Sequence, residues 1–292
     1  MTHKAGFVSI LGNPNVGKST LMNLLIGERL SIITSKAQTT RHRIMGIVNG
    51  ENFQIVYSDT PGVLTPHYKM QEYMMNYVES ALSDSDVLLY VAECRETNYN
   101  EQVANHILQS ETPVILIINK IDLVSEEMVL ASKQHWENVL HPQKTYCVSA
   151  LKGTNVAEIM GGIIDLLPES PPYFSKDELT DRPMRFFISE IIREKILLQF
   201  KKEIPYSVEV EVTEYKEDKD ITRIHAVIFV ERESQKAIIL GHKGQSIKEL
   251  GINARESIES FIEQKVYLAL SIKVQKDWRN DDSRLRRFGY GV

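Results

Sequence analysis

The 292-residue sequence is poor in cysteine and has no long hydrophobic run. Cys94 and Cys147 lie in the apolar runs "VLLYVAEC" and "TYCVSA", and they have neither the spacing of a zinc site nor the density of a disulfide scaffold. Both are expected to be buried thiols in a reducing compartment. No segment approaches the ~18 consecutive apolar residues of a membrane span, and the first apolar run is too short for a signal peptide. A cytoplasmic location is therefore expected.

Histidine and tryptophan also offer little from which to build a site in the first half of the chain. The histidines there are scattered among polar segments and lack partners at metal-ligand spacing. We expect these side chains, and the nearby tryptophan, to be exposed: His42, His67, His106, His135, His141 and Trp136.

Charge is unevenly distributed along the chain. The net charge of −5 at pH 7 would by itself argue against a nucleic-acid binder. Residues 1–182 hold 14 basic and 21 acidic residues, whereas residues 183–292 hold 20 basic and 18 acidic ones. Basic character is therefore confined to the C-terminal part, where it clusters in "RLRRF".

The first half alternates apolar runs with helix-like segments. The runs "AGFVSIL", "FQIVYSD", "VLLYVAE", "PVILIIN" and "TYCVSA" are each followed by a more polar segment. Such a pattern is typical of buried parallel strands joined by crossover helices. It predicts an α/β domain with a mostly parallel sheet over residues 1–168.

The alternation ends in a proline-rich stretch. Four prolines fall within residues 168–183, and they cannot continue a helix or a central strand, so residues 169–183 are predicted to be a linker. Residues 184–292 read as helix, strand, strand, helix, a glycine pair, a long helix and a strand. This α-β-β-α-α-β order predicts a second, smaller α+β domain with a basic C-terminal tail.

The segment "GNPNVGKST" follows an expected strand and opens a helix, which is the context that a phosphate-binding loop requires. Gly12 and Gly17 let backbone N–H groups wrap the phosphates. Lys18 neutralises phosphate charge, and the Ser19 hydroxyl is a ligand for Mg²⁺. The remaining nucleotide contacts are expected from Asn13, Asn15, Val16 and Thr20. A glycine turn beside an ordinary lysine is the plainer alternative.

Two further segments lie at expected strand ends, where a guanine-nucleotide enzyme needs them. In "DTPG", Asp59 is expected to reach Mg²⁺ through a water, and Gly62 to donate its N–H to the γ-phosphate. In "NKID", which spans Asn119, Lys120 and Asp122, the aspartate offers two acceptors to the guanine N1–H and N2 amine. Adenine presents no such donor pair. The sequence therefore predicts a site for GTP and GDP.

The segment "SAL", formed by Ser149, Ala150 and Leu151, supplies a backbone N–H for the guanine carbonyl. In these motifs the chain resembles the translation-factor-related GTPases, and with "KAQTTRHR" at residues 36–43 it resembles the Era family in particular. The resemblance implies that one of two adjacent threonines closes on Mg²⁺ when GTP is bound. We favour Thr40, although nothing in the sequence excludes Thr39.

One position departs from many GTPases. A glutamine that orients water commonly follows the "DxxG" motif, but Val63 occupies that place and cannot hydrogen-bond a water. The resemblance to GTPases with a "PNVGKS" loop implies that Asn15 helps to bind K⁺, which would substitute for an arginine finger; a role in bracing the loop is the alternative. The residues expected to act in catalysis are Lys18, Asn15, Thr40 and Gly62.

The segment "GHKGQS" holds a second glycine pair, but it follows a helix and lacks the spacing of a phosphate loop. Within its α-β-β-α-α-β unit it resembles the loop of a type II KH domain, which clamps nucleic-acid backbone. Bases would then lie beside apolar side chains, and the tail would contribute stacking and phosphate contacts. The RNA-binding residues expected are Ile239, Gly241, His242, Lys243, Gly244, Ile247, Lys248, Trp278, Arg284, Arg286 and Arg287, with Ile252 as a further groove wall. A tight helix–helix turn and a solvated basic tail are the alternatives.

Three classes of function compete. The resemblance implies a monomeric GTPase that assists maturation of the small (30S) ribosomal subunit by binding the 3′ end of its rRNA in the pre-30S particle. The alternative is a signalling GTPase at the membrane, coupling growth state to the cell cycle, with helix 184–200 as a peripheral anchor. This membrane alternative is suggested by basic side chains that lie opposite an apolar face of the helix: Arg193, Lys195, Lys201 and Lys202. A metabolic P-loop kinase would have no reason to carry both "NKID" and "SAL".

Overall fold

The computed structural model describes residues 2–291, and the chain divides into two compact units. The N-terminal unit comprises Met1–Ser31, Thr40–His67 and Gln71–Asp181. The C-terminal unit comprises Ile32–Thr39, Tyr68–Met70 and Arg182–Val292, so it includes two short segments from the first half of the sequence. Within residues 2–291, no helix has both the length and the apolar character to cross a membrane.

The N-terminal unit is built on a six-stranded sheet in the order β2-β3-β1-β4-β5-β6. All neighbouring strands are parallel except the β2–β3 pair, which is antiparallel. A mostly parallel sheet was predicted from the apolar runs, and it is confirmed. The strands are β1 (Lys4–Leu11), β2 (Ile44–Asn49), β3 (Phe53–Asp59), β4 (Val87–Glu93), β5 (Val114–Asn119) and β6 (Lys144–Cys147).

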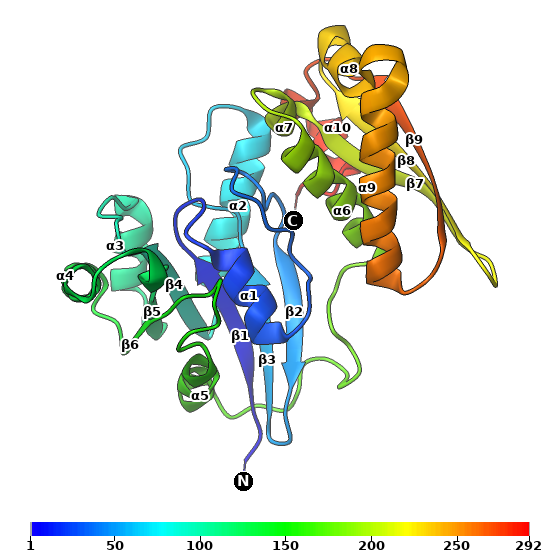
Figure 1. Ribbon diagram of the computed structural model, residues 1–292. Coiled ribbons are helices and arrows are strands. Elements are labelled where there is room, and N and C mark those ends of the chain that lie inside the picture. Colours follow the sequence, from blue (N-terminus) through cyan, green and yellow to red (C-terminus); the bar gives the residue numbers. More distant parts are fainter. Residues whose placement is uncertain (1, 292) are drawn as a thin grey trace. The chain divides into compact units, whose positions relative to one another are not determined.

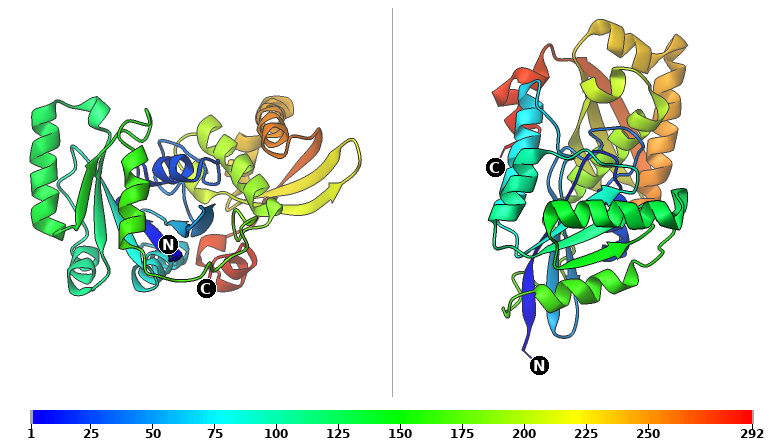
Figure 2. Two further views of the ribbon diagram at one scale, coloured as in Figure 1. Left: turned by 90° about the horizontal axis from the view of Figure 1, so that it is seen from below. Right: turned by 90° about the vertical axis from the view of Figure 1, so that its left-hand side faces the viewer.

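Helices cover both faces of this sheet, as buried parallel strands require (Figures 1 and 2). Side chains of α2, α3 and α4 form one core cluster with alternate residues of β4 and β5, and α1 and α5 lie on the opposite face. Asn100 caps α3 by accepting from the Val103 N–H. The helices are α1 (Lys18–Ile26), α2 (Lys69–Ser83), α3 (Glu101–Gln109), η1 (Ile121–Leu123), α4 (Glu126–Leu140) and α5 (Ala157–Leu166).

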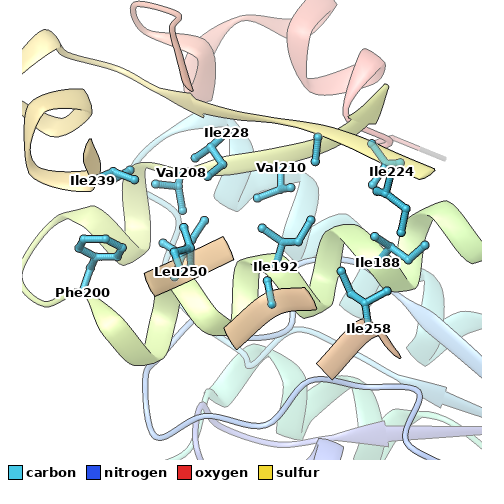
Figure 3. Close-up of a cluster of buried hydrophobic side chains, with 14 of the residues drawn as sticks. Ile188, Ile192, Phe200, Val208, Val210, Ile224, Ile228, Ile239, Leu250 and Ile258 are labelled. Carbon is cyan, nitrogen blue, oxygen red and sulfur yellow. The ribbon is translucent and has the colours of Figure 1, made fainter. Parts of the chain in front are cut away.

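The C-terminal unit has a three-stranded sheet in the order β7-β8-β9, antiparallel between β7 and β8 and parallel between β8 and β9. Figure 3 shows its core, in which Ile192 of α6, Leu250 of α9 and Ile239 of α8 pack against Ile228 of β8. The elements are α6 (Met184–Gln199), α7 (Ile204–Ser207), β7 (Glu209–Glu217), β8 (Thr222–Val230), α8 (Glu233–Leu240), η2 (His242–Gly244), α9 (Gln245–Ile262) and β9 (Val266–Val274).

The last residues of the chain fold against this unit, which is not the solvated basic tail that was the alternative for this segment. They form η3 (Trp278–Asn280) and α10 (Asp282–Arg287), and Asp281 caps α10 by accepting from the N–H groups of Ser283 and Arg284. Leu285 is buried, and the Phe288 ring lies 5.0 Å from that of Phe229. Apolar residues spaced among the arginines therefore anchor the segment.

Burial differs from expectation at four positions of the N-terminal unit, one of which is His135, whose side chain is partly buried. Trp136 is fully buried against the Tyr90 ring, and its indole N–H donates to the Glu96 carbonyl. His42 is buried as well. Cys94 is buried as predicted, whereas Cys147 is only partly so. The local sequence around Trp136 is polar because α4 exposes its other faces and buries only the stripe of Ser132, Trp136 and Leu140.

Candidate functional site

The loop after β1 has a backbone that only glycine fits at two positions. At Gly12, where φ is 142°, a Cβ would lie 2.1 Å from the Val91 carbonyl oxygen. At Gly17, where φ is 102°, a Cβ would lie 2.3 Å from Asn119 Nδ2. The loop therefore passes directly against β4 and the end of β5, and it leads into the N-terminus of α1. Such a helix start with exposed N–H groups is suited to bind anions.

The Lys18 ammonium closes the loop on itself. It is buried and donates to the carbonyl oxygens of Gly12 at 3.0 Å and Asn13 at 2.9 Å. Burial lowers the pKa of Lys18 to about 8, although the carboxylates of Asp59 and Glu96 oppose that shift. The Asn13 side chain donates to Glu96 at 2.7 Å, so its amide braces the loop. A phosphate would replace the two carbonyls as the partner of Lys18 and favour its charged form.

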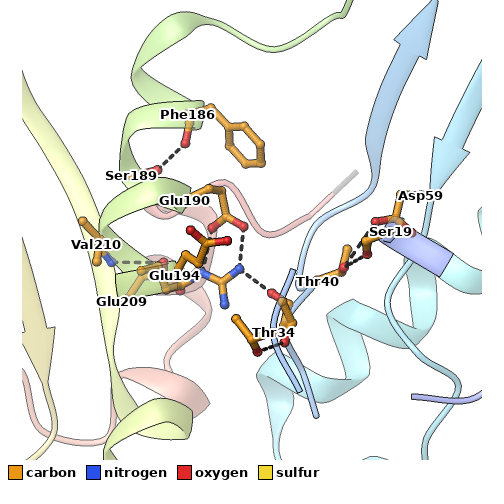
Figure 4. Close-up of polar contacts among 12 residues, drawn as sticks. Ser19, Thr34, Thr40, Asp59, Phe186, Ser189, Glu190, Glu194, Glu209 and Val210 are labelled. Carbon is orange, nitrogen blue, oxygen red and sulfur yellow. Dashed lines mark hydrogen bonds and ion pairs between the residues drawn. The ribbon is translucent and has the colours of Figure 1, made fainter. Parts of the chain in front are cut away.

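The side chains of Ser19, Thr40 and Asp59 meet beside the start of α1, as Figure 4 shows. Ser19 Oγ donates to Asp59 Oδ2 at 2.6 Å and lies 2.9 Å from Thr40 Oγ1, which is 3.3 Å from the same carboxylate oxygen. Asp59 Oδ1 is buried and has no hydrogen-bond partner among the described residues. One carboxylate and two hydroxyls are the hard oxygen donors that Mg²⁺ prefers, so the residues present fit this ion.

The two adjacent threonines have different partners. The Thr39 hydroxyl donates to the Lys36 carbonyl at 2.6 Å and lies 2.7 Å from Thr34 Oγ1. The Thr40 hydroxyl instead joins Ser19 and Asp59. The geometry thus favours Thr40 over Thr39 as the threonine that faces a metal.

The segment after β5 joins the phosphate loop to the predicted base site. Asn119 donates to the Val16 carbonyl at 2.7 Å and accepts from the Ala150 N–H at 2.9 Å. Asp122 is partly exposed, and a hydrogen bond with Ser149 lowers its pKa. An ionised carboxylate is thereby held at the end of the sheet, and the Lys152 ammonium lies 3.7 Å from its Oδ2.

Lys120 and Leu151 complete this end of the sheet. Lys120 has a left-handed backbone, with φ of 63°, and its ammonium lies 2.5 Å from a Glu93 carboxylate oxygen. The Ser149 N–H donates to the Thr154 carbonyl, which closes a short turn around Leu151. The Leu151 side chain is exposed. These contacts set the course of both loops at the edge where a guanine would lie.

The segment after β3 runs close to the phosphate loop. A Cβ on Gly62 would lie 2.7 Å from Pro14 Cα, and the Val63 N–H donates to the Gly12 carbonyl at 3.3 Å. The Val63 side chain is buried, so no polar group projects from position 63. Asn15 and Thr20 lie in the same loop and helix start; Asn15 is exposed and has a φ of 67°.

Sequence reasoning missed Asn23, which holds the chain after α1. Its Oδ1 accepts from the N–H groups of Leu30 and Ser31 at 3.1 and 2.9 Å, and its Nδ2 donates to the Ser31 carbonyl at 2.7 Å. Asparagine inside a helix is unfavourable by propensity alone. An asparagine at an unfavourable helix position was therefore the one indication in the sequence that its side chain makes structural hydrogen bonds.

The second glycine pair forms a tight connection between α8 and α9. Gly241 has φ of 69° and ψ of −178°, a region that suits glycine alone, and a Cβ there would lie 2.5 Å from Ser246 Cβ. Gly244 has φ of 76° with open space around it. His242 and Lys243 between them are exposed. The loop therefore presents two polar side chains and the N-terminus of the 18-residue α9.

Two residues expected to contact RNA are buried in the core, and both expectations are wrong. Ile239 is fully buried in the cluster between the helices and the sheet, so it does not wall a groove. Trp278 is also fully buried, and its indole N–H donates to the Ser207 carbonyl at 3.1 Å. A ring enclosed in this way cannot stack on a base.

The other predicted RNA contacts lie at or near the surface. Lys248, Ile252 and Arg286 are exposed, while Ile247 and Arg284 are partly buried. Arg287 is exposed but makes a bidentate ion pair with the Glu211 carboxylate, with N–O distances of 2.8 to 3.2 Å. Arg287 would have to leave that carboxylate to reach a phosphate.

Comparison with family models identifies both units. Residues 7–120 match the model described as a 50S ribosome-binding GTPase, and residues 203–279 match that of the KH domain. The GTPase Era of Carboxydothermus hydrogenoformans is 45% identical over 296 residues and covers 99% of each chain. The GTPase Era of Staphylococcus haemolyticus is 41% identical, covering 99% of this chain and 97% of its own.

Solved structures show the same similarity in three dimensions. A tyrosine-to-alanine variant of Era from Aquifex aeolicus bound to GDP and AlF4− matches with a TM-score of 0.94 and 37% identity, covering 99% of this chain and 100% of its own. Era in complex with MgGDPNP and nucleotides 1506–1542 of 16S ribosomal RNA matches with the same TM-score, identity and coverage.

Proposed function

The chain belongs to the Era family of GTPases, and from that membership we propose that it assists maturation of the small ribosomal subunit by binding the 3′ end of its rRNA. It is a GTP-hydrolysing protein with an N-terminal GTPase unit and a C-terminal KH domain. The observation that carries the proposal is the similarity along the whole chain to an Era structure that holds 16S rRNA nucleotides.

The N-terminal unit is proposed to bind GTP through the loop around Lys18 and through Asp122. Lys18 lies where it can exchange two backbone carbonyls for phosphate oxygens, and the Gly62 N–H is the proposed γ-phosphate donor. Ser19, Thr40 and Asp59 would hold Mg²⁺. When bound, this ion neutralises negative charge on the β- and γ-phosphates.

The remaining nucleotide contacts are also proposals. Backbone N–H groups along the loop and at the start of α1 suit the phosphates, and the segment after β6 suits the base. The residues are Gly12, Asn13, Asn15, Val16, Gly17, Thr20, Asn119, Lys120, Ser149, Ala150 and Leu151.

The KH domain is proposed to clamp RNA with the connection between α8 and α9. Gly241 and Gly244 keep side chains out of the way of a phosphate, while exposed His242 and Lys243 supply polar contacts. Exposed or partly exposed side chains on α9 and α10 extend the surface: Ile247, Lys248, Arg284, Arg286 and Arg287.

An RNA-binding experiment tests this function. The full chain is titrated against an oligonucleotide with the 3′-terminal sequence of small-subunit rRNA and against a permuted oligonucleotide of equal length. We expect the natural sequence to bind at least about tenfold more tightly, because unpaired bases are read by their edges. The salt dependence should have a slope near −0.7 per phosphate contacted. Equal affinity for both oligonucleotides would refute a specific role at this RNA.

Potassium is the proposed activator of hydrolysis. Val63 cannot orient water, so Val63→Ala should leave kcat within about one decade, whereas a group that stabilises transition-state charge contributes about 10³ or more.

Replacing K⁺ by Na⁺ should lower kcat in the native chain. Asn15→Gly should abolish that difference. The matched control is Asn155→Gly, since Asn155 is also exposed and has a φ of 59°. Identical rates in K⁺ and Na⁺ would contradict the role of Asn15.

The site of action is proposed to be the pre-30S particle in the cytoplasm, with the protein acting as a monomer. The membrane alternative gains no support from helix α6. Ile188, Ile192 and Ile196 on its apolar side belong to the core of the KH domain, and Arg193 is fully buried. An interfacial anchor would need the apolar face of that helix to be free to enter the membrane interface.

A further inference from the structure

The end of β4 and the segment after it, residues 93–98, contact both loops of the proposed nucleotide site within the N-terminal unit. The Glu93 carboxylate lies 2.5 Å from the Lys120 ammonium on the base side. On the phosphate side, the Glu96 carboxylate accepts from the Asn13 amide at 2.7 Å. None of the nucleotide-binding motifs of the sequence covers residues 93–98.

Asn13 of the phosphate loop is tied to other groups through both its side chain and its backbone. Its amide donates to Glu96 Oε1 at 2.7 Å and to the Asn98 carbonyl at 2.8 Å. Its own carbonyl accepts from the Lys18 ammonium at 2.9 Å, beside the Gly12 carbonyl at 3.0 Å. Because a side-chain amide has only two N–H donors, residues 93–98 use the whole donor capacity of Asn13. The position of this part of the phosphate loop is therefore set from outside the loop.

Glu96 is itself held by the fold of the N-terminal unit. Its N–H donates to the Glu93 carbonyl at 2.9 Å, and its carbonyl accepts from the Trp136 indole at 3.1 Å. The Trp136 ring is fully buried and packs on the Tyr90 ring, with the centroids 5.3 Å apart. A buried ring with a satisfied N–H in a close-packed core is a rigid anchor. Burial raises the pKa of Glu96, whereas the hydrogen bond from Asn13 favours its carboxylate form.

We infer that Glu96 is a positioning residue for nucleotide binding, which holds the phosphate loop, through Asn13, in the conformation that receives the phosphates. This inference rests on the proposed nucleotide role of the loop around Lys18. A loop that is already ordered loses less conformational entropy on binding, so its affinity for the ligand is higher. GDP and GTP share the α- and β-phosphates, so the effect should be equal for both nucleotides.

The test compares Glu96→Leu with Glu96→Gln in the full chain. Leucine removes the acceptor of the Asn13 amide and keeps a similar size. We expect the Kd for fluorescent GDP and for a fluorescent, non-hydrolysable GTP analogue to rise about tenfold or more, because a hydrogen bond to a charged group is worth roughly tenfold to a hundredfold in an equilibrium constant. Glutamine keeps an oxygen that can accept the same bond, so its Kd should stay within about threefold of native.

A double-mutant cycle with Asn13→Ala shows whether Glu96 acts through Asn13. Asn13→Ala removes the same hydrogen bond from the other side and should weaken both nucleotides at least as much as Glu96→Leu. The combined variant should bind within about threefold of Asn13→Ala alone, because two changes to one interaction are not additive. The control Glu111→Leu, at an exposed glutamate in the loop between α3 and β5, should match the native chain.

Lys18→Met separates this inference from the proposed function. If Lys18→Met abolishes nucleotide binding while Glu96→Leu binds like the native chain, the positioning role is wrong and the proposed site stands. If Lys18→Met binds nucleotide like the native chain, the proposed site fails and this inference fails with it. Equal losses in Glu96→Leu and Glu96→Gln, or independent losses in the cycle, would also overturn the inference. Asn13→Ala leaves Glu96 in place and tests the same bond if Glu96→Leu does not fold; native affinity in Asn13→Ala would contradict the inference as well.

Discussion

Asp122→Asn is expected to lower the affinity for GTP by about a hundredfold or more and to favour xanthosine triphosphate. In the proposed site the carboxylate would offer two acceptors to guanine, and each lost hydrogen bond with an unpaired partner costs about 1–3 kcal/mol. An amide in its place would present a donor, which matches the oxygen of xanthine. The hydrogen bond from Ser149 lowers the pKa of Asp122, which further favours the ionised form of the native group.

Competition binding with GTP and xanthosine triphosphate measures this change. Asp165→Asn is the matched control, since Asp165 is an exposed aspartate on α5 that pairs with Lys144; its preference should equal that of the native chain. An Asp122→Asn protein with native preference would show that another group selects the base.

Gly244→Asp is expected to weaken RNA binding by about tenfold or more and to leave GTP binding unchanged. Two unit charges about 4 Å apart interact by several kcal/mol near a protein surface, so a carboxylate beside a phosphate strongly opposes binding. Gly244 is a better position for this test than Gly241. A Cβ at Gly244 meets no atom within 4 Å, whereas one at Gly241 collides with Ser246, and aspartate tolerates the left-handed backbone.

Gly244→Asn is the control, because asparagine has the same shape without the charge and also accepts a left-handed conformation. Its RNA affinity should stay within about threefold of native. Fluorescence anisotropy with the 3′-terminal rRNA oligonucleotide reports both, and the aspartate should flatten the salt slope by about 0.7 for one lost phosphate contact. Equal losses in the two variants would mean that bulk at the loop, and not charge, decides the outcome.

The sequence was most informative where chemistry is local. The phosphate loop, "DTPG" and "NKID" each place their proposed functional atoms within a few residues of a strand end, so backbone geometry and residue type together are enough to propose them. The strands of the N-terminal sheet could be predicted because both of their faces are buried, which makes them continuous apolar runs in the sequence. These features required no knowledge of distant partners.

Only the tertiary structure decided which residues are hidden and which segments meet. Trp278 and Ile239 lie in segments that resemble a surface tail and a groove wall, but contacts with Ser207 and with the sheet enclose them. Arg193 belongs to the polar side of a helix by pattern, yet Glu190 and the Thr39 carbonyl surround it. The Lys36 ammonium donates to the carbonyl oxygens of Leu197 and Phe200, which lie 161 and 164 residues away in the chain. Periodicity reports only which side of an element is apolar, so the attachment of the segment Ile32–Thr39 to α6 became visible only in the folded chain.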